Sequence, residues 1–489
     1  MKRILDVPRN AFVTAEAAQC GLLIDARNYY AALYRAFEQA QDYVLISGWQ
    51  FETGVCMLRG PDARHAAHPV KFLELLGALC EERPELAVYV LAWDFSVVYA
   101  KDREWGQAEK FAAANPRIHF QWDAHPEVGG SHHQKFAVVD GAIGFIGGID
   151  ICDARWDDCE HREENPDRVN VTGDPCKPYH DVQACFGGTI VDSLVDLFTD
   201  RWGRASDELL HLARPTPATH ARYELAKLTG GSAEHIGATH AALSRTQSDS
   251  RAEAPRVSEV CSLFADAIHA AEHLIYAETQ YFTSRSVAQM FVERMRDDTR
   301  PKLEIVIFLP HGADTPMEKV ALEDTQESVL LTLLDTARET GHEVRLLYPA
   351  SRNADGSETP TFIHSKILII DDQLLMVGSP NFTERSVALD TELSISWECA
   401  SDEDHLGACI RKIRATLLAE HSGAPASEFA RERGLCAKLD ELIAAGQTRL
   451  RRREVVAAGA LGPLFAAIFD PGDTQLTGEA LSSSATRLD

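Results

Sequence analysis

The sequence lacks the features of an exported or membrane-spanning chain. It begins MKRILDVPRNAF, without the apolar core of a signal peptide, and no later run approaches the roughly eighteen apolar residues of a spanning helix. The 11 cysteines are an odd number and include no CxxC pair, which argues against a disulfide framework or a zinc site. We therefore expect a cytoplasmic or peripherally membrane-associated protein with reduced thiols, and unconventional secretion stays open.

Positive charge is scarce. The 489 residues include 48 Lys and Arg against 74 Asp and Glu, which gives a net charge of −26. Such a surface repels nucleic acids and anionic membranes at long range, so we expect no nucleic acid partner. Any anionic group that the protein handles must then be met by local cations. Hydrophobic residues make up 45%, enough for a large core divided into two or three domains.

One short stretch of the sequence brings a histidine and a lysine close together. In SHHQKFAVVD, residues 131–140, His133 and Lys135 lie two apart at the head of an apolar run. Alternation along a β-strand sends both side chains to one face and that of Gln134 to the other. A titratable ring and a cation are therefore expected side by side.

The second half of the chain repeats this pattern. In IHSKILIID, residues 363–371, His364, Lys366 and Asp371 have the same spacing, and the offset is 364 − 133 = 231. The same offset aligns GGID at 147–150 with GSPN at 378–381, and YVLISGWQF at 43–51 with LIYAETQYF at 274–282. A repeat of this length predicts an internal duplication of two large lobes.

Each lobe shows a helix-like stretch, a buried strand, a second strand, and then the histidine strand with an apolar return. We predict an α/β fold in which each of two similar lobes is a mixed β-sheet flanked by helices. The expected boundaries are an N-terminal lobe at 1–231, a connection at 232–257, a C-terminal lobe at 258–473 and a disordered tail at 474–489. Within the last lobe, residues 449–473 join basic and apolar residues, as an interfacial anchor or a segment packed on the core would.

The return after each motif predicts a hairpin. Asp-Gly at 140–141 is a strong signal for a two-residue loop, and 371–372 is its counterpart. This pairing sets His133 opposite Gly148 and His364 opposite Ser379. The small residues are expected to leave room for a substrate beside each histidine.

The motif aspartates are predicted to be structural. Asp140 lies seven residues beyond His133, which is roughly 23 Å along a straight strand, so it cannot orient that ring. The same holds for Asp371. Better orienting candidates are Asp181 and Glu392, carboxylates in strand-like runs after the return strand, because a carboxylate on Nδ1 fixes the imidazole tautomer.

The duplicated HxKxxxxD pattern resembles that of the phospholipase D superfamily, from about residue 40 to 400. Four further stretches resemble the phosphatidylcholine-type enzymes of plants and animals: GGIDICDARWDD, YHDVQACFGG with the following LFTDRW, IYAETQYF and GSPNFTERS. The resemblance implies two phospholipase D-like lobes related by a pseudo-twofold, with one active site at their interface. It also places Asp181 and Glu392 where the family keeps its histidine-orienting carboxylates.

These residue types supply phosphodiester cleavage without a metal or cofactor. One imidazole attacks to give a phosphohistidine, the other protonates the leaving group and then activates the acceptor, and the lysines stabilise charge on phosphate. The resemblance favours His133 as nucleophile and His364 as acid and base. The expected substrate-binding residues are Gly148, Ser379, Asn381, Glu278 and Gln280. The acidic stretch 153–167 lacks regular ligand spacing, so a solvated loop is favoured over a calcium site.

The predicted function is hydrolysis of glycerophospholipids of the phosphatidylcholine or phosphatidylethanolamine class, at a membrane or micelle surface. The products are phosphatidic acid and the head-group alcohol, with water or a primary alcohol as acceptor and hence transphosphatidylation. The alternative is a phosphatidyltransferase of the cardiolipin-synthase kind, and a nuclease is less favoured because of the net charge. A lipid-binding module without activity is disfavoured because both motifs are intact.

Overall fold

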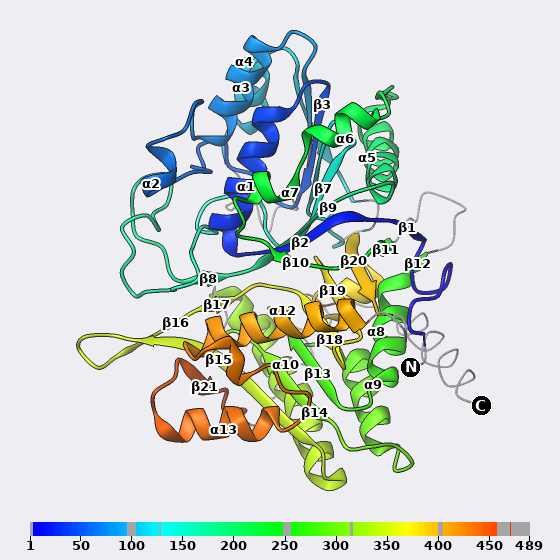
Figure 1. Cartoon of the computed structure of the whole chain (residues 1–489), viewed down its shortest axis with the longest axis vertical. Coiled ribbons are helices and arrows are strands. Elements are labelled where there is room, and N and C mark those ends of the chain that lie inside the picture. The colour runs from blue at the N-terminus through cyan, green and yellow to red at the C-terminus, as the bar shows by residue number, and fades with distance from the viewer. Residues whose placement is uncertain are drawn as a thin grey trace. The chain divides into compact units, whose positions relative to one another are not determined.

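The structure is a computed structural model. It describes residues 3–94, 104–125, 127, 129–247, 256–312, 316–399, 404–456 and 470, with the side chains of 316–322 and 404 left out. The chain divides into two compact units (Figure 1). The N-terminal unit consists of Thr14–Cys159 and Glu164–Ala241, and the C-terminal unit consists of Met1–Val13, Glu160–Glu163 and Ala242–Asp489.

The N-terminal unit is built on a mixed sheet of eight strands in the order β10-β2-β9-β7-β6-β3-β4-β5. β3, β4 and β5 run parallel, whereas β6 pairs antiparallel with both β3 and β7. The strands are β2 (Ala18–Ile24), β3 (Tyr43–Gly48), β4 (Ala87–Trp93), β5 (Ile118–Asp123), β6 (Phe136–Val139), β7 (Ile143–Gly147), β9 (Val182–Gly187) and β10 (Glu234–His235); the short β8 (Tyr179–His180) precedes β9.

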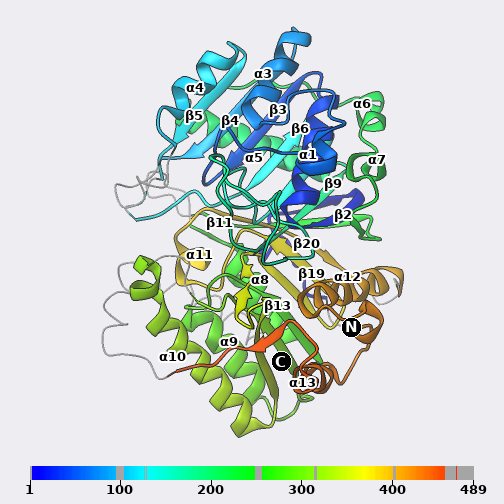
Figure 2. The ribbon, with the colours of Figure 1, turned by 90° about the vertical axis from the view of Figure 1, so that its left-hand side faces the viewer.

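Helices cover both faces of this sheet (Figure 2). Ala137 and Val139 of β6 lie in one core with residues of α1, α3 and α4, while Phe136 meets Phe198 of α5 on the other face. Strand alternation thus gives β6 two buried faces, as its unbroken apolar run requires. The helices are α1 (Asp25–Gln39), α2 (Gly60–Ala63), α3 (Phe72–Glu82), α4 (Gln107–Ala114), α5 (Ile190–Ser206), α6 (Pro217–Arg222) and α7 (Leu225–Thr229).

The C-terminal unit has the same strand sequence in its sheet, β11-β20-β19-β18-β13-β14-β15. Here β13, β14 and β15 are parallel, and β18 pairs antiparallel with β13 and β19. The strands are β11 (His240–Gln247), β12 (Val257–Ser258), β13 (Leu274–Glu278), β14 (Glu304–Phe308), β15 (Glu343–Arg352), β16 (Glu358–Pro360), β17 (Phe362–Ile363), β18 (Ile367–Ile370), β19 (Leu374–Gly378), β20 (Glu392–Glu398) and β21 (Leu450–Arg452), and β1 (Val13–Glu16) lies at the boundary.

The helices of this unit also repeat those of the first. α8, α9 and α10 lie between successive strands as α1, α3 and α4 do, and α12 follows β20 as α5 follows β9. The predicted mixed α/β fold is confirmed, and the matching strand order is what a duplicated chain should give. The helices are α8 (Glu259–Ala270), α9 (Arg285–Arg296), α10 (Pro316–Thr340), α11 (Glu384–Ala388), α12 (Asp404–Ser422) and α13 (Leu435–Ala445), with a 3-10 turn at Ala426–Glu428.

The unit boundaries differ from the predicted ones. Residues 232–257, expected as a connection, contain β10 and all of β11, because their small and polar residues still pair with β2 and β20. Met1–Val13 belongs to the C-terminal unit, where the Leu5 N–H donates to the Glu398 carboxylate at 3.0 Å. The predicted tail at 474–489 lies outside the described residues.

The segment 449–473 is described only in part. β21 pairs antiparallel with β15, so the beginning of the segment belongs to the sheet of the C-terminal unit. Its apolar portion at 457–469 lies outside the described residues. In the described part of the chain, none of the helices has both the length and the apolar character needed to cross a bilayer.

Both motif hairpins contain one residue more than predicted. Val139 pairs with Ile143, and Ile370 pairs with Leu374, so each loop has three residues. The tight turn forms where expected, with φ of 49° at Asp140 and 63° at Gly141, but one further residue bulges before the return strand. The register therefore moves by one position. Lys135, and not His133, faces a glycine, since the Gly147 N–H donates to the Lys135 carbonyl at 3.3 Å.

The motif aspartates hold the turn that leads into the central strand of each sheet. Asp140 accepts the N–H groups of Asp42 at 2.8 Å and Tyr43 at 3.0 Å, and the Tyr223 hydroxyl at 2.7 Å. Asp371 likewise accepts the N–H groups at the end of the α8–β13 turn, including that of Leu274 at 2.7 Å. These contacts support the structural role expected for both.

Replacing Asp371 by asparagine should mainly reduce stability. The amide keeps one acceptor oxygen but loses the second, and three main-chain donors then compete for it. We expect the free energy of unfolding to fall by about 1–3 kcal/mol, with little change in turnover per folded molecule. Urea unfolding and an activity titration measure the two effects. Asp298→Asn, at an exposed aspartate of the same unit, is the control and should unfold as the wild type does.

Candidate active site

His133 and Lys135 lie just before β6, at the carboxyl end of the neighbouring strand β3. The Lys135 side chain is buried, and its Nζ lies 3.1 Å from Asp150 Oδ2 and donates to the His133 carbonyl at 3.2 Å. Burial of an ammonium group is unfavourable without such partners. The carboxylate and the carbonyl therefore compensate the burial of the Lys135 amino group close to the predicted nucleophile.

Asp150 also accepts hydrogen bonds from two groups other than Lys135. Its Oδ1 accepts the Trp49 N–H at 2.8 Å, and its carbonyl accepts the Tyr30 hydroxyl at 2.7 Å. The ring of Trp49 stacks on Trp93 with centroids 5.5 Å apart. One buried carboxylate thus links the motif lysine to the segment that follows β3.

The C-terminal unit arranges its motif in a related way. Lys366 Nζ donates to the His364 carbonyl and lies 3.4 Å from Gln280 Oε1. Asn381, the counterpart of Asp150 at the 231-residue offset, accepts the Gln280 N–H at 3.2 Å through Oδ1. The predicted residues Gln280 and Asn381 therefore lie together with Lys366.

The two predicted orienting carboxylates occupy equivalent places. Asp181 immediately precedes β9 and Glu392 begins β20, and both strands pair with the return strand of a motif hairpin. Both carboxylates are buried. Their offset is 392 − 181 = 211, shorter than that of the motifs, because the N-terminal unit has a longer loop before β9.

Gly148 does not have the expected surroundings. A Cβ placed there would lie 2.3 Å from Asp181 Oδ1, so the glycine makes room for this carboxylate and not for a substrate. Its N–H already donates to the Val182 carbonyl at 3.2 Å, which corrects the expectation that this group is available to phosphate.

The counterpart of Gly148 is also engaged. The Ser379 hydroxyl donates to Glu392 Oε2 at 2.5 Å, and the Ser386 hydroxyl donates to Oε1 at 2.7 Å. The Asn381 N–H in turn donates to Ser386 Oγ at 3.2 Å. Ser379 therefore binds the carboxylate that we expected to orient His364, and the loop carrying Asn381 is tied to the same group.

A buried guanidinium lies under the N-terminal motif. Arg201 of α5 donates to Gln134 Oε1 at 2.9 Å and to Ser47 Oγ at 2.8 Å, and pairs with Asp123 at 2.7 Å. Gln134 is the residue between His133 and Lys135, so α5 holds the motif from the face opposite to them. Burial would raise the pKa of Asp123, but Arg201 outweighs it and the pKa lies well below its usual range.

His132 completes this group. Its Nε2 lies 3.2 Å from Asp123 Oδ1. Burial, reinforced by the charge of Arg201, lowers the pKa of His132 to about 4, so its ring is neutral at physiological pH. This histidine serves the buried network.

Glu278 takes part in the corresponding network of the C-terminal unit. It accepts the hydroxyls of Tyr276 and Ser365, and His421 Nε2 of α12 lies 2.9 Å from its Oε1. Ser365 is the middle residue of the second motif. The structure thus gives Glu278 a place beneath the motif strand, where it is 1% exposed, in contrast to the expected contact with substrate.

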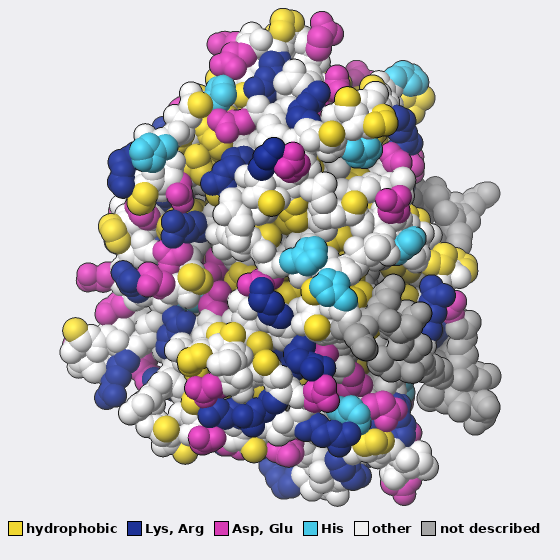
Figure 3. Space-filling model, viewed as in Figure 1, with side chains coloured by type: hydrophobic (Ala, Val, Ile, Leu, Met, Phe, Trp, Pro, Cys, Tyr) yellow, Lys and Arg dark blue, Asp and Glu magenta, His cyan; other side chains and the backbone are white. Residues whose placement is uncertain are grey.

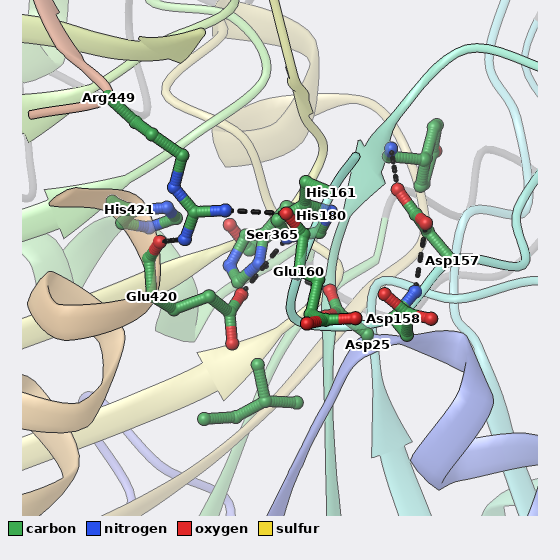
Figure 4. Close-up of polar contacts among 12 residues, drawn as sticks. Asp25, Asp157, Asp158, Glu160, His161, His180, Ser365, Glu420, His421 and Arg449 are labelled. Atoms are coloured by element: carbon green, nitrogen blue, oxygen red, sulfur yellow. Dashed lines mark hydrogen bonds and ion pairs between the residues drawn. The ribbon is translucent and has the colours of Figure 1, made fainter. Parts of the chain in front are cut away.

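The acidic stretch 153–167 is less solvated than expected. Asp157 is buried, accepts the Tyr179 N–H at 2.9 Å and pairs with Arg168 at 2.9 Å. His161, which belongs to the C-terminal unit, lies 3.2 Å from Glu420 (Figure 4). The Asp157 and Glu420 carboxylates are thus paired with groups of the protein itself.

Several of these residues carried no usable signal in the sequence. Arg201 lies in LFTDRW, but position 432, at the 231-residue offset, is a glutamate, so the repeat gives Arg201 no basic counterpart. Asp123 and His421 stand apart from every motif. Asp150 was visible in GGID, where its alignment with Asn381 indicated a shared position, but the ion pair with Lys135 depends on the fold. The apolar periodicity of α5 indicates which face of this helix packs on the sheet, and Arg201 lies on that face.

Comparison with known proteins identifies the family. Residues 36–305 match the family described as Phospholipase D, and residues 264–407 match the family described as Cardiolipin synthase, PLD-like domain. The first match covers more than half of the chain.

Individual relatives are distant. The chain is similar to phospholipase D alpha 1 of Cynara cardunculus, with 22% identity over 80% of this chain and 62% of that protein. It is also similar to phospholipase D1 of Saccharomyces cerevisiae, with 24% identity over 83% of this chain and 29% of that protein. It thus spans less than two thirds of either relative.

A solved structure shares the fold. The crystal structure of phosphatidylserine synthase from Haemophilus influenzae has a TM-score of 0.52 and 14% identity, and the match covers 98% of this chain and 96% of that one. Together with the family match over residues 36–305, these relatives show that the chain belongs to the phospholipase D superfamily.

Proposed function

We propose that the protein is a phospholipase D-type phosphodiesterase that acts on glycerophospholipids at a membrane or micelle surface. The observation that carries the proposal is the repeated arrangement of the two motifs. In each unit a buried lysine lies against a side-chain oxygen, and a buried carboxylate begins or precedes the strand next to the motif hairpin. A cytoplasmic, peripheral location is part of the proposal.

The chemistry follows from these groups. His133 attacks phosphorus and the phosphorus–oxygen bond to the head group breaks, while His364 gives its proton to the departing alcohol. His364 then takes a proton from water, or from a primary alcohol, which displaces His133 from phosphorus. Lys135 and Lys366 stabilise the non-bridging oxygens of the five-coordinate transition states. Asp181 and Glu392 orient the rings and favour the imidazolium that forms.

A facing glycine gives no support to the assignment of His133 as nucleophile, because in the observed register Lys135 and not His133 lies opposite a glycine. The assignment is supported by exposure within the structure. His133 is half-buried, whereas His364 is 7% exposed. The more open ring is better placed to accept phosphorus, and the enclosed ring is suited to proton transfer.

One of the family matches supports a second candidate activity. Residues 264–407 match the family described as Cardiolipin synthase, PLD-like domain, so a phosphatidyltransferase is the alternative. Nucleic acid cleavage is less favoured. Among the described side chains on the face in Figure 3, basic and acidic groups are interspersed, and the chain carries a net charge of −26.

Incubation with mixed-head-group liposomes tests the proposal. The protein should release phosphatidic acid and the free head-group alcohol, and added ethanol should divert part of the product to phosphatidylethanol. Lipid mass spectrometry identifies both, and the His133→Ala, His364→Ala double variant is the control. Diacylglycerol as the product would overturn the proposal, and exchange between lipids without hydrolysis would favour the phosphatidyltransferase.

Glu392→Gln should slow turnover without unfolding the protein. The amide keeps an acceptor for one serine hydroxyl, but it cannot stabilise a charged His364 ring, so we expect kcat to fall by roughly 10²-fold or more. The matched control is Glu398→Gln on the same strand, whose carboxylate accepts main-chain N–H groups of residues 4 and 5. It should lower the melting temperature and leave kcat unchanged, and the reverse pattern would contradict the assignment.

The roles of the two histidines can be separated with a p-nitrophenyl phosphodiester. This leaving group needs little protonation, so His364→Ala should form the covalent intermediate and stall before hydrolysis. His133→Ala should form none. Mass spectrometry after alkaline quenching, which preserves phosphohistidine, detects the adduct. A phosphorylated His364 in the His133→Ala protein would reverse the assignment.

A further inference from the structure

The two motif lysines lie beside different oxygens, and this difference has a chemical consequence. Lys135 lies 3.1 Å from a carboxylate, that of Asp150, whereas Lys366 lies 3.4 Å from the amide oxygen of Gln280. Asp150 and Asn381 nevertheless perform the same main-chain task, since they accept the N–H groups of Trp49 at 2.8 Å and of Gln280 at 3.2 Å, which are equivalent positions at the 231-residue offset. An asparagine would serve that task at position 150, so the negative charge there has another effect.

That charge acts on Lys135. Both side chains are buried, at 2% and 4% exposure, so their attraction is weakly screened by solvent. Arg155 also lies within electrostatic range of Asp150. The carboxylate therefore reduces the net positive charge that the N-terminal motif presents to an incoming phosphate.

The charge of the phosphate changes during the proposed reaction. A phosphodiester carries one negative charge, whereas a phosphomonoester product carries up to two, because its second pKa is about 6. A site rich in uncompensated cations holds a dianion more tightly than a monoanion. Such a site would retain its own product.

We propose that Asp150 makes the site selective for monoanionic phosphodiesters over dianionic phosphomonoesters. By offsetting the charge of Lys135, it weakens the hold on the monoester product while the lysine still donates to the diester. This inference rests on the proposed function and deepens it by naming the charge state that the site prefers.

Binding of two small anions to the full-length protein tests the inference. At pH 8 methyl phosphate is a dianion and dimethyl phosphate is a monoanion. Asp150→Asn keeps the acceptor for the Trp49 N–H and removes one charge. It should tighten methyl phosphate by roughly tenfold more than dimethyl phosphate, measured by calorimetry or by competition in the p-nitrophenyl assay. Equal tightening of both anions, or none, would overturn the inference.

The reciprocal variant guards against misfolding of the first. Asn381→Asp places a carboxylate beside Gln280, whose main-chain N–H donates to residue 381 and whose side-chain oxygen contacts Lys366. It should weaken methyl phosphate more than dimethyl phosphate, by a comparable factor. If Asp150→Asn does not fold, as judged by its melting curve, this variant alone decides, and unchanged selectivity rejects the inference. Failure of the liposome assay would reject the proposed function separately, since these measurements record anion binding and not turnover.

Discussion

The buried guanidinium of Arg201 is the interaction on which the N-terminal motif depends. It reaches from α5 to three strands of the sheet, binding Ser47 of β3, Asp123 of β5 and Gln134 ahead of β6. A single buried cation, paired with a carboxylate, thus holds the segment that carries His133 and Lys135 through the side chain of Gln134. Breaking such a pair by removing one partner is expected to cost about 3–5 kcal/mol, so the motif geometry is coupled to global stability.

The C-terminal unit meets the same constraint with other chemistry. Ser365, which takes the place of Gln134, donates to Glu278, and His421 of α12 lies behind that carboxylate. In both units the helix after the strand that follows the motif hairpin, α5 after β9 and α12 after β20, therefore contributes a basic side chain to the polar group that contacts or includes the middle residue of the motif. In each motif the middle residue is buried and polar, and it needs a hydrogen-bond partner on the face opposite to the histidine and the lysine. The two units supply that partner with different side chains.

The sequence predicted the mixed sheets because apolar runs, a histidine spacing and an offset of 231 recur together. It also predicted structural roles for Asp140 and Asp371, since strand length alone separates them from the histidines. The predicted register of each hairpin was wrong by one residue, because the bulged residue that follows the turn leaves no mark in composition, whether the turn is Asp-Gly at 140–141 or Asp-Asp at 371–372. The place of Gly148 was misjudged for a related reason. A small residue admits any neighbour, and here the neighbour is the Asp181 carboxylate.

The two units agree in strand order and differ in charge beside the motif lysines. Asp150 and Asn381 are nearly the same shape, and each accepts a main-chain N–H with an equivalent oxygen. The electrostatic effect of exchanging them is large because the neighbouring lysines are buried. A repeated fold can therefore keep its hydrogen bonds while one copy adjusts the charge presented to phosphate.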